Sequence, residues 1–298
     1  MNNICILINN KDRPTELFGL LQSLRTQTLQ NFDIFIMDDQ SGTTLNKYHF
    51  MNCMLMRLKL ENHKVHIKRT TFNYGVSKAR HEIVEWAMKE GDYDFFVRVD
   101  DDVILEQNYL EELMKVIDKG YDIASGVTVP MTSPVLERET KHLKGGIINR
   151  VILDKDGNYI LNGDDCGFKY IDKKMLPAHH FRSCAMIKRK VHEKVKYYPT
   201  TLSNHGFREE QIFSYNALME GFTIGVNTGA INYHMLTPSG GERFSNSREL
   251  IIFNQKQFLL FTKKHKDKLN KLFTKDDMPD SLELMKENNL LMLEVKIK

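Results

Sequence analysis

Several features that would assign a function class quickly are scarce or absent in this sequence. Its 298 residues include only four cysteines, Cys5, Cys53, Cys166 and Cys184, and none belongs to a CxxC pair. This spacing argues against a zinc knuckle and favours a reducing compartment. No apolar run approaches the roughly 18 residues of a membrane span, and the start MNNICILINN lacks the basic region and cleavage site of a signal peptide. We therefore expect a cytoplasmic protein or one that is peripheral on a membrane.

Two further absences narrow the function. No G-x-G-x-x-G segment follows an expected strand, which argues against a dinucleotide-dependent dehydrogenase. The segment NNKDRP after the first expected strand has no glycine, whereas sugar nucleotidyltransferases usually carry a glycine-rich loop there. The net charge is only +3 and no basic patch is interleaved with aromatic residues, so a nucleic-acid partner is not expected.

Strand-like and helix-like segments alternate in the first half of the chain. Strands are expected at 4–8, 32–37, 65–68 and 95–99, and helices at 15–26, 76–88 and 110–117. This alternation predicts βαβ units and an α/β fold with a mostly parallel, Rossmann-like sheet flanked by helices. Ligands of such sheets bind beyond the carboxyl ends of the strands.

The second half has a different pattern. The segment LDKDGNYIL predicts a β-hairpin with Asp156-Gly157 as its turn. Helices are expected at 207–220 and 250–261, and strands at 222–226 and 230–234. The tail after Lys263 is first lysine-rich and then amphipathic.

The segment FVRVDDDVIL places Asp100, Asp101 and Asp102 directly after an expected strand. Neighbouring carboxylates repel one another, and ionised ones are costly to bury unpaired. A Mg²⁺ or Mn²⁺ ion would neutralise them, and a bound diphosphate would complete its coordination shell. The alternative is a solvated turn near a helix N-terminus. An EF-hand does not fit, because Ile104 stands at its third ligand position.

Six segments, in their order along the chain, resemble the family 2 glycosyltransferases of the GT-A fold. They are ICILINNKDRP, LLQSLRTQTLQNFDIFIMDDQS, FNYGVSKARHEIVEWA, VDDDVILEQNYLEEL, FREEQIFSYNALMEGF and AINYHM. The resemblance implies a GT-A domain at 1–245, with a nucleotide-binding half at 1–130 and an acceptor-side half, containing the smaller β-hairpin region, at 131–245. A helical C-terminal extension would occupy 246–298.

The resemblance also implies a metal site and a donor site. Asp102 and Asp100 of the DxD motif would bind Mn²⁺ or Mg²⁺, with His234 completing the site, although a structural histidine is the alternative. The donor would be bound by Asn9, Arg13, Asp39, Asn73, Arg80, Asp100 and Asp101. Asp39 would accept a hydrogen bond from an N–H of the base, because an ionised carboxylate is an acceptor only. The alternative for Arg80 is a salt bridge on an exposed helix face.

The general base implied by the resemblance is Glu210, with Glu209 as the competing candidate. The family usually has aspartate at this position, and the longer glutamate leaves the choice between the two residues open. An exposed acidic first turn of a helix is the alternative for Glu209. A second departure is Lys11, which stands where the family usually places an aromatic residue against the base.

The resemblance therefore implies an inverting, metal-dependent glycosyltransferase that transfers one sugar to an acceptor hydroxyl. The Q-x-x-R-W signature of processive synthases is absent. We expect a UDP-sugar donor, with GDP- and dTDP-sugars as alternatives, and a glycan, lipid-linked or protein acceptor. The alternative function is a non-catalytic nucleotide-sugar or carbohydrate-binding module.

Two segments outside these motifs add further predictions. MLTPSGGERFSNS contains Gly240 and Gly241 and is interpreted as a lid over the donor, with a plain surface loop as the alternative. The basic segment KKHKDKLNKLF could touch anionic lipid as a peripheral membrane contact. A helix that packs on the main domain, or a dimer contact, is the alternative for this segment.

Overall fold

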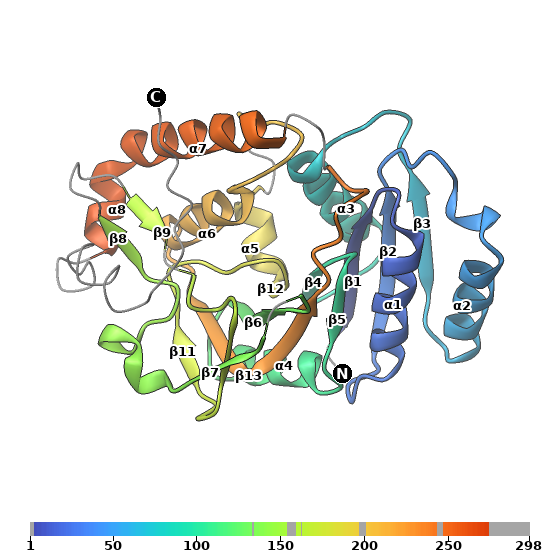
Figure 1. Cartoon of the computed structure of the whole chain (residues 1–298), viewed down its shortest axis with the longest axis horizontal. Helices are drawn as coiled ribbons and strands as arrows, with labels where there is room; N and C mark the ends of the chain where they lie inside the picture. Colours follow the sequence, from blue (N-terminus) through green and yellow to red (C-terminus); the bar gives the residue numbers. More distant parts are fainter. Residues whose placement is uncertain are drawn as a thin grey trace.

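The computed structural model describes residues 3–132, 134–153, 159–161, 163–196, 201–242 and 247–273. A nine-stranded sheet runs through the molecule, with helices packed on both of its faces (Figure 1). Its strands follow the order β11-β13-β6-β12-β4-β1-β2-β3, and β5 pairs with β13 off this path. The predicted α/β class is therefore confirmed.

The strands at the N-terminal side of the sheet are parallel to one another, as predicted. They are β1 (Ile4–Asn10), β2 (Phe32–Asp38), β3 (Val65–Arg69) and β4 (Phe95–Asp100). Strands β1, β2 and β4 are almost continuously buried, which is the pattern of strands covered on both faces. The register sets Asn10 beside Asp38 and Asn9 beside Asp100, so three strand ends meet at one edge of the sheet.

The other side of the sheet is mixed. It contains β5 (Val103–Leu105), β6 (Ile123–Pro130), β11 (Met175–Pro177), β12 (Ala185–Lys188) and β13 (Ile224–His234). Strands β6 and β13 are parallel, whereas β12 runs antiparallel between β6 and β4. Strands β5 and β11 are antiparallel to β13.

The prediction of two strands at 222–226 and 230–234 was wrong, because β13 spans both segments. The register of β13 against β6 shifts between Val226 and Ile231. Within this stretch the side-chain carbonyl of Asn227 accepts a hydrogen bond from the backbone N–H of Gly229 at 2.9 Å. The polar residues between the two predicted strands therefore form an irregularity inside one strand.

Three helices cover each face of the sheet. Helices α1 (Pro14–Arg25), α2 (His49–Leu60) and α4 (Tyr109–Asp118) pack on one face, and α3 (Val76–Glu90), α5 (Arg189–Lys194) and α6 (Glu209–Met219) pack on the other. Gly75, before α3, has a φ of 73°, and a Cβ there would lie 2.5 Å from Cα of Asn204. This glycine therefore allows α3 to begin in contact with the segment that precedes α6.

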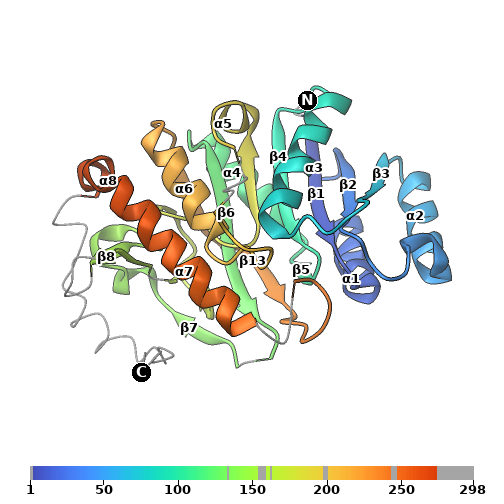
Figure 2. The same ribbon diagram turned by 90° about the horizontal axis from the view of Figure 1, so that it is seen from above.

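Two further helices lie at the C-terminal end of the described chain. Helix α7 (Ser247–Lys264) lies beside α6 in the view from above, and α8 (Lys266–Leu272) follows it (Figure 2). Tyr215 of α6 packs on Phe258 of α7, with ring centroids 5.8 Å apart. The predicted helix at 250–261 is thus confirmed, while residues 274–298 of the predicted extension lie outside the described residues. Among the helices described, none has both the length and the apolar character to cross a bilayer.

The smaller elements lie on the acceptor side of the predicted division. Strand β7 (Leu136–Arg138) pairs in parallel with β10 (Phe168–Tyr170), and β8 (Val151–Leu153) pairs antiparallel with β9 (Tyr159–Leu161). The β8–β9 pair fits the predicted hairpin, whose Asp156-Gly157 turn lies outside the described residues. Short 3-10 helices occur on this side at Thr140–His142 and Lys144–Gly146, and a third, Leu45–Lys47, lies in the predicted nucleotide-binding half.

Candidate active site

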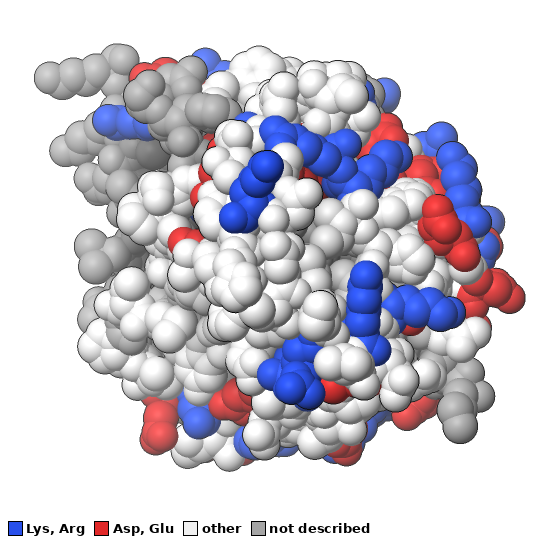
Figure 3. All heavy atoms as spheres, turned by 90° about the vertical axis from the view of Figure 1, so that its right-hand side faces the viewer, with Lys and Arg blue, Asp and Glu red and all other residues white. Residues whose placement is uncertain are grey.

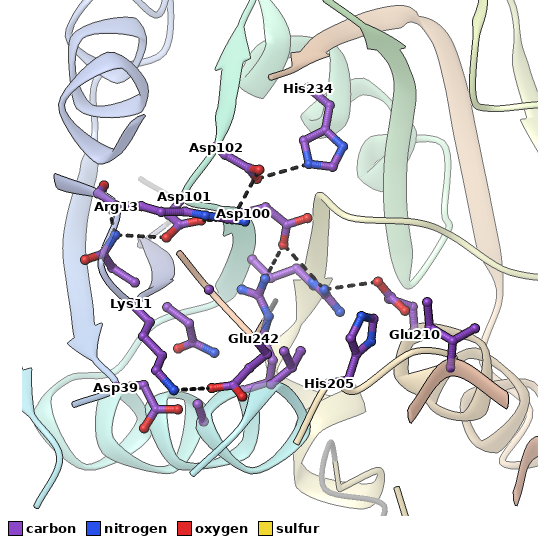
Figure 4. A pocket seen from close by; sticks show the side chains of 18 residues that line it. Lys11, Arg13, Asp39, Asp100, Asp101, Asp102, His205, Glu210, His234 and Glu242 are labelled. Carbon is purple, nitrogen blue, oxygen red and sulfur yellow. Dashed lines mark hydrogen bonds and ion pairs between the residues drawn. The ribbon is translucent and has the colours of Figure 1, made fainter. Parts of the chain in front are cut away.

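A pocket of about 370 Å³ lies at the sheet edge where β1, β2 and β4 end (Figure 4). Every predicted site residue except Glu209 and Asn73 lines it. The lining residues are Asn9, Asn10, Lys11, Arg13, Asp39, Val76, Ala79, Arg80, Arg98, Asp100, Asp101, Asp102, His205, Glu210, His234, Gly241, Glu242 and Ile251. The topology thus gathers residues from across the chain at the position that the strand ends predict.

The middle aspartate of the cluster is paired by the chain itself. One Asp101 oxygen lies 3.0 Å from Nη1 of Arg13, and the other accepts a hydrogen bond from the Asn10 amide at 2.8 Å. Burial raises the pKa of Asp101 to about 7 against the opposing effect of Arg13, and the charge of Asp102 raises it further. Asp101 is therefore a buried anchor for the loop after β1.

Asp102 and His234 form the part of the site best suited to a metal ion. Nε2 of His234 lies 3.0 Å from Oδ1 of Asp102, and Nη1 of Arg13 lies 3.1 Å from Oδ2. A carboxylate oxygen and an imidazole nitrogen are ligands that Mn²⁺ accepts. Within the described residues no group of three His, Cys, Asp or Glu side chains is assembled around one point. The pair therefore fits an ion whose remaining ligands come from a bound diphosphate or water.

Asp100 instead faces a pair of arginines. It forms an ion pair with Arg80 of α3, and Nη2 of Arg98 lies 3.7 Å from its Oδ1. Arg80 is only 5% exposed and also donates a hydrogen bond to the Val99 carbonyl at 3.2 Å. The alternative of an exposed surface salt bridge for Arg80 is therefore wrong. The aspartate cluster is held together by the three guanidinium groups of Arg13, Arg80 and Arg98.

Glu209 and Glu210 begin α6 but have different surroundings. Glu209 is 1% exposed, and its Oε1 lies 2.7 Å from Nη1 of Arg98. Burial raises the pKa of Glu209 to about 8, although the charge of Arg98 acts in the opposite direction. Glu210 lines the pocket, has a side chain 23% exposed, and lies 3.6 Å from Nη2 of Arg98. Of these two glutamates, only Glu210 lines the pocket and can contact a ligand there.

The residue before these glutamates has an unusual backbone conformation. Arg208 has a φ of 80°, which is uncommon for a residue other than glycine. Its Nε donates to the Gln255 side chain at 2.7 Å, and its guanidinium lies over the Phe207 ring at 4.4 Å. Arg208 therefore ties the start of α6 to α7.

Asp39 and Asn73 mainly order the loop that precedes α3. Asp39 accepts hydrogen bonds from the Thr70 hydroxyl and from the backbone N–H groups of Tyr74 and Gly75, at 3.0, 2.8 and 2.9 Å. The described residues thus use three of its roughly four acceptor positions. Asn73 accepts from the Gly75 N–H at 3.0 Å and donates to Glu242 at 3.3 Å.

The segment 237–242 closes one side of the pocket. Its Glu242 carboxylate lies 2.7 Å from Nζ of Lys11, and the N–H of Gly241 donates to the Lys11 carbonyl at 2.8 Å. Nε of Arg13 donates to the Ser239 carbonyl at 3.1 Å. The segment interpreted as a lid thus packs on the loop after β1, and its residues 243–246 lie outside the described residues.

Sequence reasoning missed Asn10, Glu242 and His205 as residues of this pocket. Asn10 could have been found from its place at the end of a predicted strand. Glu242 and His205 lie in segments without periodicity, and no spacing in the sequence connects them to the aspartate cluster. In Figure 4, His205 lies beside Glu210, and Glu242 lies beside Lys11.

Comparison with known proteins assigns this chain to a family. Residues 4–196, well over half of the chain, match the model of glycosyl transferase family 2. The chain belongs to glycosyl transferase family 2. No curated protein matches its sequence.

Solved structures with the same fold include members that bind nucleotide sugars. TarS of S. aureus (residues 1–349), alone and with UDP-GlcNAc, is 13% and 14% identical, with TM-scores of 0.53 and 0.54 over 79% and 80% of this chain. GalNAc-T7 with UDP, GalNAc and Mn²⁺ is 13% identical, with a TM-score of 0.61 over 96% of this chain. This chain spans 60% of the TarS chain and 57% of the GalNAc-T7 chain. These likenesses show the fold, and the predicted GT-A class is confirmed.

Proposed function

We propose that this chain is an inverting, metal-dependent glycosyltransferase that moves one sugar from a nucleoside-diphosphate sugar to an acceptor hydroxyl. The observation that carries the proposal is the placement of Glu210 and the aspartate cluster in one pocket (Figure 4). A carboxylate with access to the pocket stands across it from the Asp102–His234 pair. Such a pocket can hold a donor diphosphate on one side and an acceptor on the other.

Glu210 acts as the general base. Its carboxylate takes the proton of the acceptor hydroxyl while that oxygen forms a bond to the anomeric carbon. The bond from the anomeric carbon to the diphosphate oxygen breaks, and the nucleoside diphosphate leaves with the electron pair. Attack opposite the leaving group inverts the anomeric configuration. Nη2 of Arg98 lies 3.6 Å from this carboxylate and places a positive charge beside it.

Basic and amide side chains bind the donor. Lys11, Arg13 and Arg80 line the pocket and carry the positive charge that a diphosphate requires. Both polar atoms of the Asn9 amide are buried without a hydrogen-bond partner among the described residues. An amide in this state is satisfied when a ligand in the pocket supplies a donor and an acceptor.

UDP is the expected nucleotide, with GDP and dTDP as alternatives. Asp39 has one acceptor position beyond those used by the described residues, which suits the N–H of uracil. Two structures with the same fold contain UDP-GlcNAc or UDP, which also favours this choice. Lys11, which stands where the family usually has an aromatic residue, would contact the base or ribose through its aliphatic stem.

The metal ion would be held by Asp102 and His234. Bound there, Mn²⁺ or Mg²⁺ supplies positive charge that stabilises the leaving diphosphate. Arg13 also pairs with Asp102, so part of the charge compensation belongs to the chain itself. Asp100 is held by Arg80 and Arg98 and is available to a ribose hydroxyl or to metal-bound water.

The proposal is tested by measuring donor binding and donor cleavage together. Thermal unfolding of the chain is recorded with UDP, GDP and dTDP, each with Mn²⁺ or with a chelator. Release of UDP from UDP-GlcNAc and related donors is then measured with candidate acceptors. We expect UDP with Mn²⁺ to raise the unfolding midpoint most, because a ligand that binds only the folded state stabilises it.

Variants separate the enzyme from a binding module. Asp102→Asn should abolish the additional stabilisation by Mn²⁺, whereas Asp118→Asn at the exposed end of α4 should not. A chain that binds UDP-sugar with Mn²⁺ but releases no UDP with any acceptor would instead be a non-catalytic binding module. Equal stabilisation with and without metal would contradict the metal site.

A further inference from the structure

Helix α2 and the edge strand β3 lie together at one side of the molecule (Figure 1), and none of their residues lines the pocket. We define this surface, the α2 face, as the exposed side chains of residues 47–69. Strand β3 is the last strand of the sheet on this side, and its residues Ile67, Lys68 and Arg69 are exposed. The catalytic proposal uses none of the side chains of this face.

The α2 face exposes an unusual number of large apolar side chains. Met51, Met54 and Leu58 of α2 are buried in the core. On the opposite side of the same helix, Met56 is 66% exposed and Leu60 is 68% exposed. Phe50, at 39%, and Ile67, at 44%, add to this group. A helix that is apolar on both sides has a second surface that its own core does not cover.

Positive charge surrounds these apolar side chains. Residues 47–69 contain six Lys or Arg residues and a single acidic residue, Glu61, whereas the whole chain has a net charge of only +3. Glu61 is neutralised by Arg25, whose Nε lies 2.7 Å from its carboxylate. Figure 3 shows this side of the molecule, with Lys and Arg gathered around neutral side chains and acidic ones mainly towards the margins.

The basic residues flank the apolar group along the helix. Arg57 and Lys59 are exposed in the last turn of α2, and Lys64 is exposed just before β3. Lysines on an edge strand also prevent pairing between sheet edges. That role does not account for exposed Met56 and Leu60, which lie on the helix.

We propose that the α2 face docks this protein on an anionic lipid surface. Phe50, Met56 and Leu60 would enter the boundary between headgroups and acyl chains, while Arg57, Lys59 and Lys64 contact anionic headgroups. A second copy of this chain is a poor occupant, because two such faces would bring excess positive charge together. A polyanion such as nucleic acid would use the basic residues but not the apolar centre. The surface is independent of the proposed catalytic function.

The test is co-sedimentation of the full chain with vesicles of phosphatidylcholine alone and of phosphatidylcholine with 30% phosphatidylglycerol (about one anionic lipid in three). We expect binding only to the anionic vesicles, and a loss of about tenfold when the salt concentration rises from 0.1 to 0.5 M, roughly as screening requires. Arg57→Gln with Lys59→Gln, and separately Met56→Gln with Leu60→Gln, should each weaken binding by about tenfold or more.

Matched control variants show whether the α2 face or another basic surface binds the vesicles. Lys89→Gln with Lys119→Gln removes two exposed charges elsewhere and should leave binding within about twofold. Lys263→Gln with Lys264→Gln probes the basic C-terminal segment in the same way. Circular dichroism confirms that each variant is folded, and UDP release in solution should be the same for all of them.

Three results would overturn the proposal. The first is the absence of binding to anionic vesicles, which would leave a soluble partner as the occupant. The second is a loss confined to the Lys263 and Lys264 variant, which would move the contact to the C-terminal segment. The third is binding that the apolar variant does not change, which would indicate a polyanion site rather than a lipid surface.

Discussion

The carboxylates on the two walls of the pocket differ in how they are paired with other side chains. On the β1–β4 wall, Asp101 and Asp102 are buried and each has a cationic or amide partner from the chain. On the α6 wall, Glu209 is buried against Arg98, while the adjacent Glu210 keeps access to the pocket. On the α6 wall, local pairing thus fixes Glu209, whereas Glu210 keeps access to the pocket and is the candidate base.

Arg98 connects these two walls. It lies on β4 with a side chain 3% exposed, within 4.0 Å of Asp100, Glu209 and Glu210. One buried guanidinium therefore sets the positions of a donor-side carboxylate and of both acidic residues of α6. Substitutions of Arg98, Glu209 and Glu210 therefore test whether the two walls differ in this way.

The largest expected effect is on turnover. Glu210→Gln should lower the rate of sugar transfer by about a thousandfold, because an amide cannot accept the acceptor proton. Binding of UDP with Mn²⁺ should change little, since donor groups lie on the other wall. The matched variant Glu209→Gln should keep transfer within about tenfold. A larger loss for Glu209→Gln than for Glu210→Gln would reverse the assignment of the base.

The next effect is on stability. At about pH 9, above the pKa of Glu209, Arg98→Gln leaves this ionised carboxylate buried without its cation and should lower the free energy of unfolding by roughly 3 kcal/mol. Urea denaturation measures this change. The double variant with Glu209→Gln should recover part of it, because the uncompensated carboxylate is then absent. Additive effects of the two substitutions would show that Arg98 and Glu209 are not coupled.

Gly240 tests the segment that closes the pocket. Its φ is 72°, and a Cβ there would lie 2.6 Å from Cγ of Arg13 and 2.8 Å from the Asp12 carbonyl oxygen. Gly240→Ala should therefore displace the segment at a cost of about 2 kcal/mol and weaken donor binding. Gly120→Ala is a matched control, since φ is 109° there and no atom lies within 4 Å of the added Cβ. Donor affinity by calorimetry should fall only for Gly240→Ala, and unchanged affinity would remove the lid interpretation.

The sequence predicted the β1–β4 wall of this pocket better than the α6 wall. Strands β1, β2 and β4 are mostly apolar, and the aspartates and asparagines at their ends needed only the parallel topology to meet. Helix α2 was not predicted, because its apolar residues occur on both sides and give no single stripe. Strands β6 and β12 were also missed, although both are apolar and buried.

The contacts between the site residues were harder to predict from the sequence than the residues themselves. Asp102 meets His234 across 132 positions of sequence, and Lys11 meets Glu242 across 231. The family resemblance supplied the first pair, and nothing in the residue pattern supplied the second. Glu209 and Glu210 are adjacent in the first turn of α6, so spacing alone could not show that Glu209 is buried and Glu210 lines the pocket.

The smallest expected effect concerns the contact between the two walls at low pH. His192 of α5 packs between Phe96 of β4 and Phe213 of α6, with ring centroids 5.3 and 5.7 Å apart. Burial lowers its pKa from 6.5 to about 3, and the charges of His81 and Arg98 act in the same direction. The folded protein therefore keeps this imidazole neutral at a pH where the unfolded chain protonates it.

Because the folded pKa is the lower one, this contribution is fully present above about pH 6.5 and is lost as the pH falls towards 3. At pH 5 the loss should be about 2 kcal/mol, from roughly 1.4 kcal/mol per pH unit. His192→Gln should remove this part of the acid dependence in urea denaturation between pH 7 and 5, whereas His49→Gln on the exposed side of α2 should not. If the free energies of unfolding of wild type and His192→Gln fall in parallel over this range, protonation of His192 does not destabilise the contact between β4 and α6.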